Sequence, residues 1–129
     1  MRGDLPEKID VNHSTLLATI GAQWDKDIVP QLTDYIRIPA KSPHFDPQWQ
    51  SHGHIERVIT LAHEWVRKQP VRGLSVELVR LPGRTPLLYF DVAGTGDRTA
   101  LLYGHLDKQP EMTGWRPGYG PWDPLYQDG

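Results

Sequence analysis

The stretch Leu74-Ser75-Val76-Glu77-Leu78-Val79 marks the point where the apolar pattern of this chain changes from a helical repeat to an alternating one. Alternation of apolar and polar side chains is typical of a strand with one buried face. The pattern predicts a strand over about residues 74–81. Pro82-Gly83-Arg84 predicts the turn that follows, and the apolar run 87–92 predicts a second, more fully buried strand.

Beyond these strands the chain becomes rich in turn-forming residues. Ala93-Gly94-Thr95-Gly96-Asp97 predicts a turn, and a third, buried strand is expected over about residues 99–104. Residues 105–129 are predicted to form a long loop of Pro and Gly that carries large aromatic side chains. A loop of this length is usually functional or disordered, and we expect some surface to cover its aromatics, which are Trp115, Tyr119, Trp122 and Tyr126.

Two helices are expected before the strands. Apolar residues recur every four positions from Leu16 to Ile36, which predicts a helix over about residues 14–37. Pro30 lies inside this pattern, and its ring would clash with the carbonyl group four residues earlier, so we expect a kink or a split. A second helical pattern predicts a helix over about residues 51–68, which ends before Pro70.

The order of two main helices, three strands and a long loop predicts an α/β fold with helices packed against a sheet. The chain has 129 residues, of which 38% are hydrophobic and 23% are charged, as expected for a globular chain with a core. Length and composition are therefore compatible with one domain over residues 1–129.

Charge and cysteine content exclude several classes of function. Lys and Arg number 14 and Asp and Glu number 16, so the net charge of −2 favours neither nucleic acid nor an anionic membrane as a partner. The absence of cysteine excludes disulfides and thiolate metal sites. The start of the chain lacks the apolar stretch of a signal peptide, and no membrane-spanning run occurs, so a soluble, cytoplasmic protein is expected.

His105 and Asp107 are the candidate site residues. The two residues are two positions apart on an extended segment, so their side chains point to the same side. They follow the end of a predicted strand, which is where α/β sheets bind ligands. Such a pair suits a metal ligand with an orienting carboxylate, or a general base with its orienting residue. The same spacing occurs at His44-Phe45-Asp46, which we expect to be a surface loop.

Other histidines and tryptophans favour structural interpretations. His63-Glu64 begins like the helical zinc motif, but Arg67 stands where the second histidine would be needed. His52 and His54 are expected to be surface residues, because two positions apart they do not share a helical face. The two helical tryptophans, Trp24 and Trp65, lie on apolar faces and are predicted to pack in the core.

The sequence of residues 101–129 is similar to a segment found in a known protein family. Residues 101–110 read Leu-Leu-Tyr-Gly-His-Leu-Asp-Lys-Gln-Pro, and Trp115, Pro121-Trp122-Asp123-Pro124 and Asp128-Gly129 follow. The chain resembles the N-terminal part of the dizinc peptidases of the carnosinase, glutamate carboxypeptidase and acetylornithine deacetylase family, also called peptidase family M-twenty. The pair Gln109-Pro110 is more similar to the dipeptidase branch.

The resemblance implies a zinc-dependent metallopeptidase that cleaves the amide bond of dipeptides, peptides or N-acyl amino acids by metal-activated water. It makes His105 a ligand of one of two zinc ions and Asp107 the carboxylate that orients the imidazole. Lys108 stands where the family has an apolar residue.

Several parts of the family's site are absent from this chain, namely the bridging aspartate, the glutamate base and the remaining zinc ligands. The inserted dimerisation domain, through which the full-length protein of the family could form a homodimer, is absent too. The resemblance thus predicts an inactive fragment of a catalytic domain with at most one partial, weak zinc site.

Two alternatives remain open. The chain is also compatible with a non-catalytic binding module that uses its aromatic C-terminal loop to pair with a partner. In a third interpretation, His105 is a hydrogen-bonded core residue of an unrelated small α/β protein.

Overall fold

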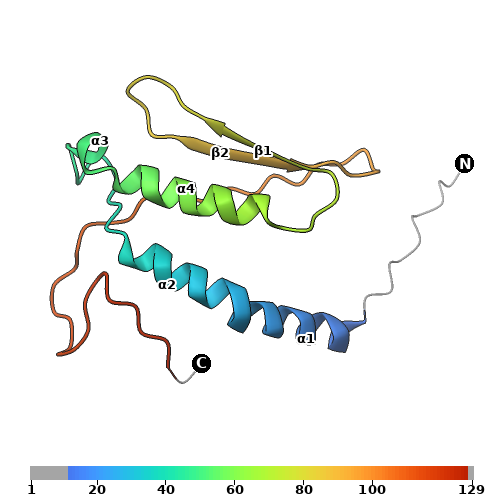
Figure 1. The fold of residues 1–129 in the computed structure, drawn as a ribbon, viewed down its shortest axis with the longest axis horizontal. Helices are drawn as coiled ribbons and strands as arrows, with labels where there is room; N and C mark the ends of the chain where they lie inside the picture. The colour runs from blue at the N-terminus through green and yellow to red at the C-terminus, as the bar shows by residue number, and fades with distance from the viewer. Residues whose placement is uncertain (1–11, 128–129) are drawn as a thin grey trace, which may run out of the picture. The chain divides into compact units, whose positions relative to one another are not determined.

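The computed structural model of the chain describes residues 12–127, and its helices and strands are shown in Figure 1. Contacts divide the chain into two compact units, Met1–Thr33 and Asp34–Gly129. Helices and an antiparallel pair of strands make up the regular structure, so the mixed α/β class predicted from the sequence is confirmed. Asp128-Gly129, part of the family resemblance, lies outside the described residues.

The helical range predicted over 14–37, with a kink or split expected at Pro30, is interrupted. α1 spans His13–Gln23 and starts at Asn12, whose side-chain oxygen accepts a hydrogen bond from the backbone N–H of Thr15. A π-helical turn spans Trp24–Ile28, and α2 spans Val29–Arg37. The π-helical turn ends two residues before Pro30. Pro30 has no N–H to bond the carbonyl group of Lys26, four residues back, and this accounts for the break.

No residue of α1 is buried. Trp24 keeps 41% of its surface exposed, so the core position predicted for it is wrong, whereas Trp65 on α4 is half-buried. A helical repeat of apolar residues predicts which side chains share a face, but it does not say whether another element covers that face.

The range predicted as a helix over 51–68 covers α4 and the second half of a separate short helix, α3. α3 spans Trp49–His52 and α4 spans His54–Arg67. Gly53 separates them with a φ of 69°, a left-handed conformation that glycine adopts without steric cost and that ends α3. α4 then buries one face at helical spacing, with Ile55, Val58, Ile59 and Val66 inside.

β1, Leu74–Val79, and β2, Leu87–Val92, form an antiparallel hairpin in which Leu74 pairs with Val92 and Val79 pairs with Leu87. β1 shows the alternating burial expected from its sequence. β2 was predicted to be more fully buried, and this is wrong, because Leu88 is partly buried and the other residues of the strand are exposed. The sheet has two strands, so the outer edge of each strand has no partner strand among residues 12–127.

The third strand predicted over residues 99–104 is not formed. Leu101, Leu102 and Tyr103 are 89%, 88% and 90% exposed, so the expected burial of this stretch is also wrong. A strand needs a neighbouring backbone to satisfy its N–H and C=O groups, and no segment between residues 12 and 127 pairs with this one.

The core of the second unit joins the chain after α2 to α4. Ile38 and Ala40 are buried together with Ile55 and Val58, and the partly buried Tyr35, Trp49, Leu61 and Leu106 pack against this cluster. Leu106 lies between His105 and Asp107 in the sequence. The core therefore anchors the segment that carries both candidate site residues.

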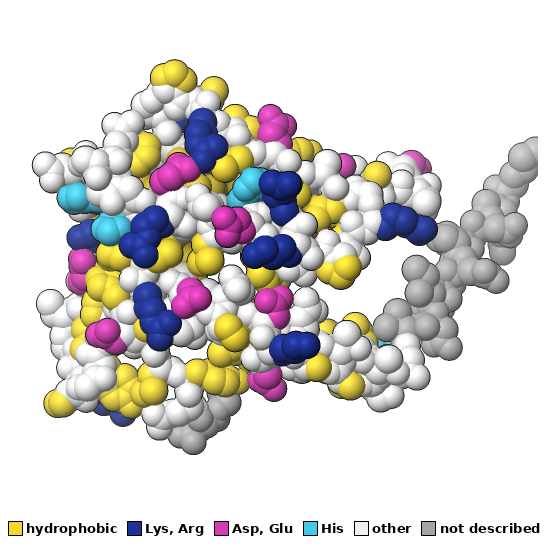
Figure 2. Space-filling view, viewed as in Figure 1, with side chains coloured by type: hydrophobic (Ala, Val, Ile, Leu, Met, Phe, Trp, Pro, Cys, Tyr) yellow, Lys and Arg dark blue, Asp and Glu magenta, His cyan; other side chains and the backbone are white. Residues whose placement is uncertain are grey.

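The outer face of α4 is charged. Figure 2 shows acidic and basic side chains interspersed on the visible face. Glu56, Arg57, Glu64 and Arg67 are exposed on α4, and Glu56 forms an ion pair with Arg80. None of the helices within residues 12–127 has the length and apolar character needed to cross a bilayer.

Candidate functional site

His105 and Asp107 are in direct contact. Nδ1 of His105 lies 2.8 Å from the backbone oxygen of Asp107 and 3.1 Å from its carboxylate oxygen Oδ1. The side chain of His105 is 62% exposed and that of Asp107 is 33% exposed. The interpretation of His105 as a core residue is therefore wrong.

The two acceptors determine the tautomer of His105. A backbone carbonyl and a carboxylate both accept hydrogen bonds, so Nδ1 must carry the proton that it shares with Asp107. In the neutral ring the lone pair is then on Nε2. An exposed imidazole whose Nδ1–H is bonded to a carboxylate is the usual arrangement of a histidine metal ligand, and it equally suits a general base.

Tyr35 holds the middle of this segment. Its hydroxyl group donates a hydrogen bond of 3.0 Å to the backbone oxygen of Leu106. Burial, and to a lesser extent the negative charge of Asp107, raise the pKa of the Tyr35 phenol. The hydroxyl therefore keeps its proton and remains a donor over a wide pH range.

The other His-x-Asp sequence forms a different arrangement. Asp46 is buried, and its Oδ2 lies 2.9 Å from Nδ1 of His52 on α3, while its Oδ1 accepts a hydrogen bond from the backbone N–H of Gln48. His44 packs edge-on against Phe45 instead. These contacts make Asp46 a structural residue at the start of α3, and they separate this sequence from the His105 pair.

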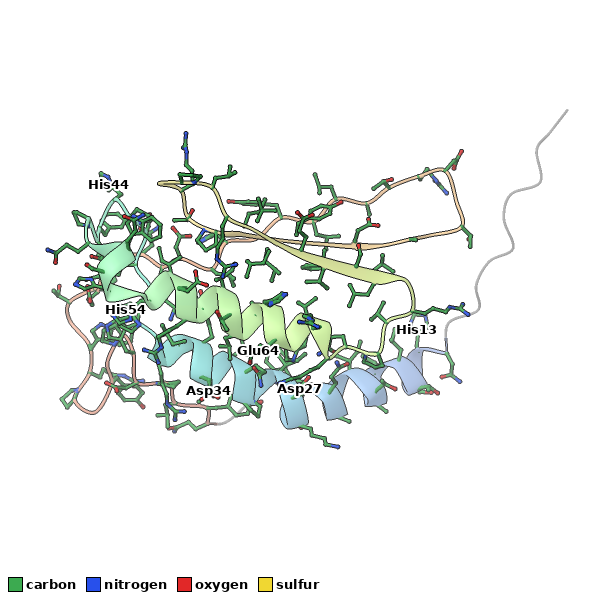
Figure 3. All side chains as sticks on the ribbon, turned by 45° about the horizontal axis from the view of Figure 1, so that its top comes forward. His13, Asp27, Asp34, His44, His54 and Glu64 are labelled. Atoms are coloured by element: carbon green, nitrogen blue, oxygen red, sulfur yellow. The ribbon has the colours of Figure 1, made fainter. Side chains whose placement is uncertain are left out.

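The pairing of Asp46 with His52 is not among the sequence predictions. Figure 3 shows His44 on the loop before α3 and His54 at the start of α4. His52 is half-exposed, and its ring centroid lies 5.9 Å from that of His54. An aspartate followed by proline ahead of a helix was a usable signal for the bond from Asp46 to the backbone of Gln48, but it does not identify His52 as the partner.

The C-terminal loop is partly folded back on the chain. Glu111 forms an ion pair of 3.1 Å with Lys41, and the indole N–H of Trp115 donates to the backbone oxygen of Met112. Trp122 is half-buried, and its ring lies 5.1 Å from Nζ of Lys108. Other aromatic side chains of the loop, including Trp115 and Tyr126, remain exposed.

Zinc would find one imidazole ligand at this site. Within residues 12–127, no three or more His, Asp or Glu side chains come together in a group that could hold a metal ion. The chemistry of His105 with Asp107 fits one protein ligand and its orienting partner, whereas a catalytic zinc ion needs three protein ligands.

Neither a scan against protein-family models nor a comparison with curated proteins finds a match to this chain.

Proposed function

We propose that residues 104–110 are the first metal-binding segment of a zinc-dependent hydrolase of amide bonds. His105 is the zinc ligand in this proposal, and Asp107 orients its imidazole. The observation that carries the proposal is that both acceptors on Nδ1 belong to Asp107, while Nε2 lies on a largely exposed ring. The resemblance of the segment to the dizinc peptidases supports the same assignment.

Each residue has a defined task. His105 would bind the metal through Nε2, and the carboxylate of Asp107 would hold the ring in that orientation and make Nε2 more basic. Zinc, when bound, supplies a nucleophilic water and polarises the carbonyl group of the amide. Dipeptides, peptides and N-acyl amino acids are the proposed substrates, and further ligands and a general base must come from groups outside the described site.

The 129-residue chain alone is therefore expected to bind zinc weakly and to hydrolyse no dipeptide. The absence of cysteine is compatible with the cytoplasmic location that we propose for the enzyme.

The test is a zinc titration of the whole chain, in which the NMR signals of its 6 histidine rings are monitored. We expect the His105 ring to respond at the lowest zinc concentration and His105→Ala to remove that response. Asp107→Asn should weaken binding by about tenfold or more, because carboxylate partners of ligating histidines have effects of that size.

His44→Ala is the matched control, because His44 has the same spacing to an aspartate but makes no hydrogen bond to it. The proposal is wrong if zinc perturbs His52 and His54 first, or if His105→Ala binds zinc as well as the unchanged chain. Nanomolar affinity that disappears in His105→Ala would instead reveal a complete site.

A binding module is the second candidate function, and the exposed apolar side chains favour it. Leu101, Leu102 and Tyr103 lie in the open, and so do Leu125 and Tyr126 near the end of the described chain. Contiguous apolar surface on a soluble protein often marks an interaction site. A cooperative thermal transition and a single defined oligomer in sedimentation would support this candidate, whereas unlimited aggregation would argue against it.

A further inference from the structure

The ammonium group of Lys108 lies at the C-terminal end of α2. Its Nζ donates to the backbone oxygens of Tyr35 at 2.6 Å, Ile36 at 3.1 Å and Ile38 at 2.6 Å. These contacts use all three N–H donors of the group. The last carbonyl groups of a helix have no partner within the helix and carry partial negative charge, so a lysine here is bound by both hydrogen bonds and the helix dipole.

Two aromatic rings complete the surroundings of this ammonium group. Nζ lies 4.2 Å from the ring centroid of Tyr35 and 5.1 Å from that of Trp122. A cation over an aromatic face gains electrostatic attraction, and the gain grows as water is excluded. Burial lowers the pKa of Lys108 to about 8, so near neutral pH the group keeps its proton and all of these contacts.

The backbone of Lys108 is fixed as well. Its N–H donates to the oxygen of Ala40 at 2.8 Å, and its own oxygen accepts from the N–H of Ser42 at 2.9 Å, which forms a short parallel bridge between Lys41 and Lys108. The peptide plane that joins Asp107 to Lys108 is thus held from one side.

The same peptide group contacts His105 with its other end. The N–H and C=O of a trans peptide point in opposite directions. Anchoring the Lys108 N–H on Ala40 therefore directs the Asp107 oxygen toward Nδ1 of His105, at 2.8 Å. The side chain of Lys108 ties the same residue to the C-terminal end of α2, which adds a second restraint to that of the Ala40 hydrogen bond.

We propose that Lys108 is a positioning residue that orients the His105 imidazole, because its hydrogen bonds hold the segment of residues 105–108 against the C-terminal end of α2. The inference deepens the proposed function and rests on it for the role of His105. It also explains a lysine at a position where the resembling family has an apolar residue, since an apolar side chain would leave the helix carbonyls without this partner.

The test measures the tautomer of His105 by long-range proton–nitrogen NMR near neutral pH, without zinc. The unchanged chain is expected to hold its proton on Nδ1. Lys108→Gln should shift the ratio of the two tautomers toward Nε2–H by about fivefold, the equivalent of one ordinary hydrogen bond. Lys108→Arg keeps the charge and the donors and should restore most of the original ratio.

Lys41→Gln is the matched control, because Lys41 lies on the same bridge but directs its ammonium group to Glu111. It should leave the tautomer unchanged. If Lys108→Gln does not fold, Trp122→Leu removes one ring contact from the edge of the site and should give a smaller shift in the same direction.

An unchanged tautomer in folded Lys108→Gln, or in Trp122→Leu where Lys108→Gln does not fold, would overturn the positioning role. A shift in Lys41→Gln equal to that in Lys108→Gln would overturn it too. Because no zinc is present, this result is independent of the zinc titration. A tautomer that depends on Lys108 in a chain whose His105 does not bind zinc would keep the positioning role and reject the metal assignment.

Discussion

Asp46 bonds His52, at 2.9 Å, and not His44, although His44 has the same spacing to it as His105 has to Asp107. The two His-x-Asp sequences differ in what surrounds the aspartate. Asp46 is buried at the start of α3 and faces a histidine from the end of that helix, whereas Asp107 lies between anchored residues and turns toward the ring before it. The His-x-Asp spacing allows a bond from His44 to Asp46 as well as one from His105 to Asp107, but in the packed structure only the second forms.

The Asp46 carboxylate should make stability depend on acid. The hydrogen bond from His52, with a further one from the backbone of Gln48, lowers the pKa of Asp46 below its ordinary value of 3.8. A carboxyl group whose pKa is lower in the folded chain stabilises the fold above the unfolded pKa, and this contribution is lost as pH falls through the folded pKa.

We therefore expect Asp46→Asn to lower the melting temperature near neutral pH, with the difference shrinking as pH falls below the folded pKa of the native carboxyl group. Thermal melts at a series of acidic pH values would measure it. Asp34→Asn is the control, because Asp34 forms an exposed ion pair with Arg37 that contributes little. Equal effects of the two variants would contradict the assignment.

Gly53 should resist substitution because of its backbone alone. A Cβ atom built there meets nothing within 4 Å, but the φ of 69° is strained for any residue with a side chain. Gly53→Ala should cost about 1–2 kcal/mol of unfolding free energy in denaturant titrations. Gly94→Ala, at a position with open space and no positive φ, should change stability by less than about 0.5 kcal/mol.

Val58 is the most completely buried large side chain in the described core, at 1% exposure. Val58→Ala should lower the free energy of unfolding by about 1–3 kcal/mol, because it removes buried methyl groups and leaves a cavity. Val71→Ala makes the same chemical change at a position that is 46% exposed, so it should have little effect. A comparable loss in both variants would show that α4 does not form the core described.

The exposed segment over residues 99–104 should promote self-association. Leu101 and Leu102 present apolar side chains on a backbone that no part of residues 12–127 pairs with. Such a segment is a template for strand pairing between chains. Replacing both leucines by lysine should lower the sedimentation coefficient at high protein concentration, whereas an unchanged distribution would place the contact elsewhere.

Local patterns in the sequence predicted the features that depend only on residues close together in the chain. The strand β1 was predicted from alternation, β2 from an apolar run, and the turn between them from Pro82-Gly83-Arg84. The break near Pro30 follows from a missing N–H and a ring clash. The split at Gly53 was missed, because a single glycine inside a helical pattern is tolerated in many helices.

The sequence by itself determined the mixed α/β class, the residues of both strands and the proximity of His105 to Asp107, since each of these depends on covalent spacing and local backbone preference. Only the tertiary structure decided which apolar runs are buried, which histidine bonds Asp46, and that Lys108 reaches the end of α2 from about seventy residues away in sequence. Burial and such long-range contacts depend on which elements meet in space, and no local pattern of side chains encodes that meeting.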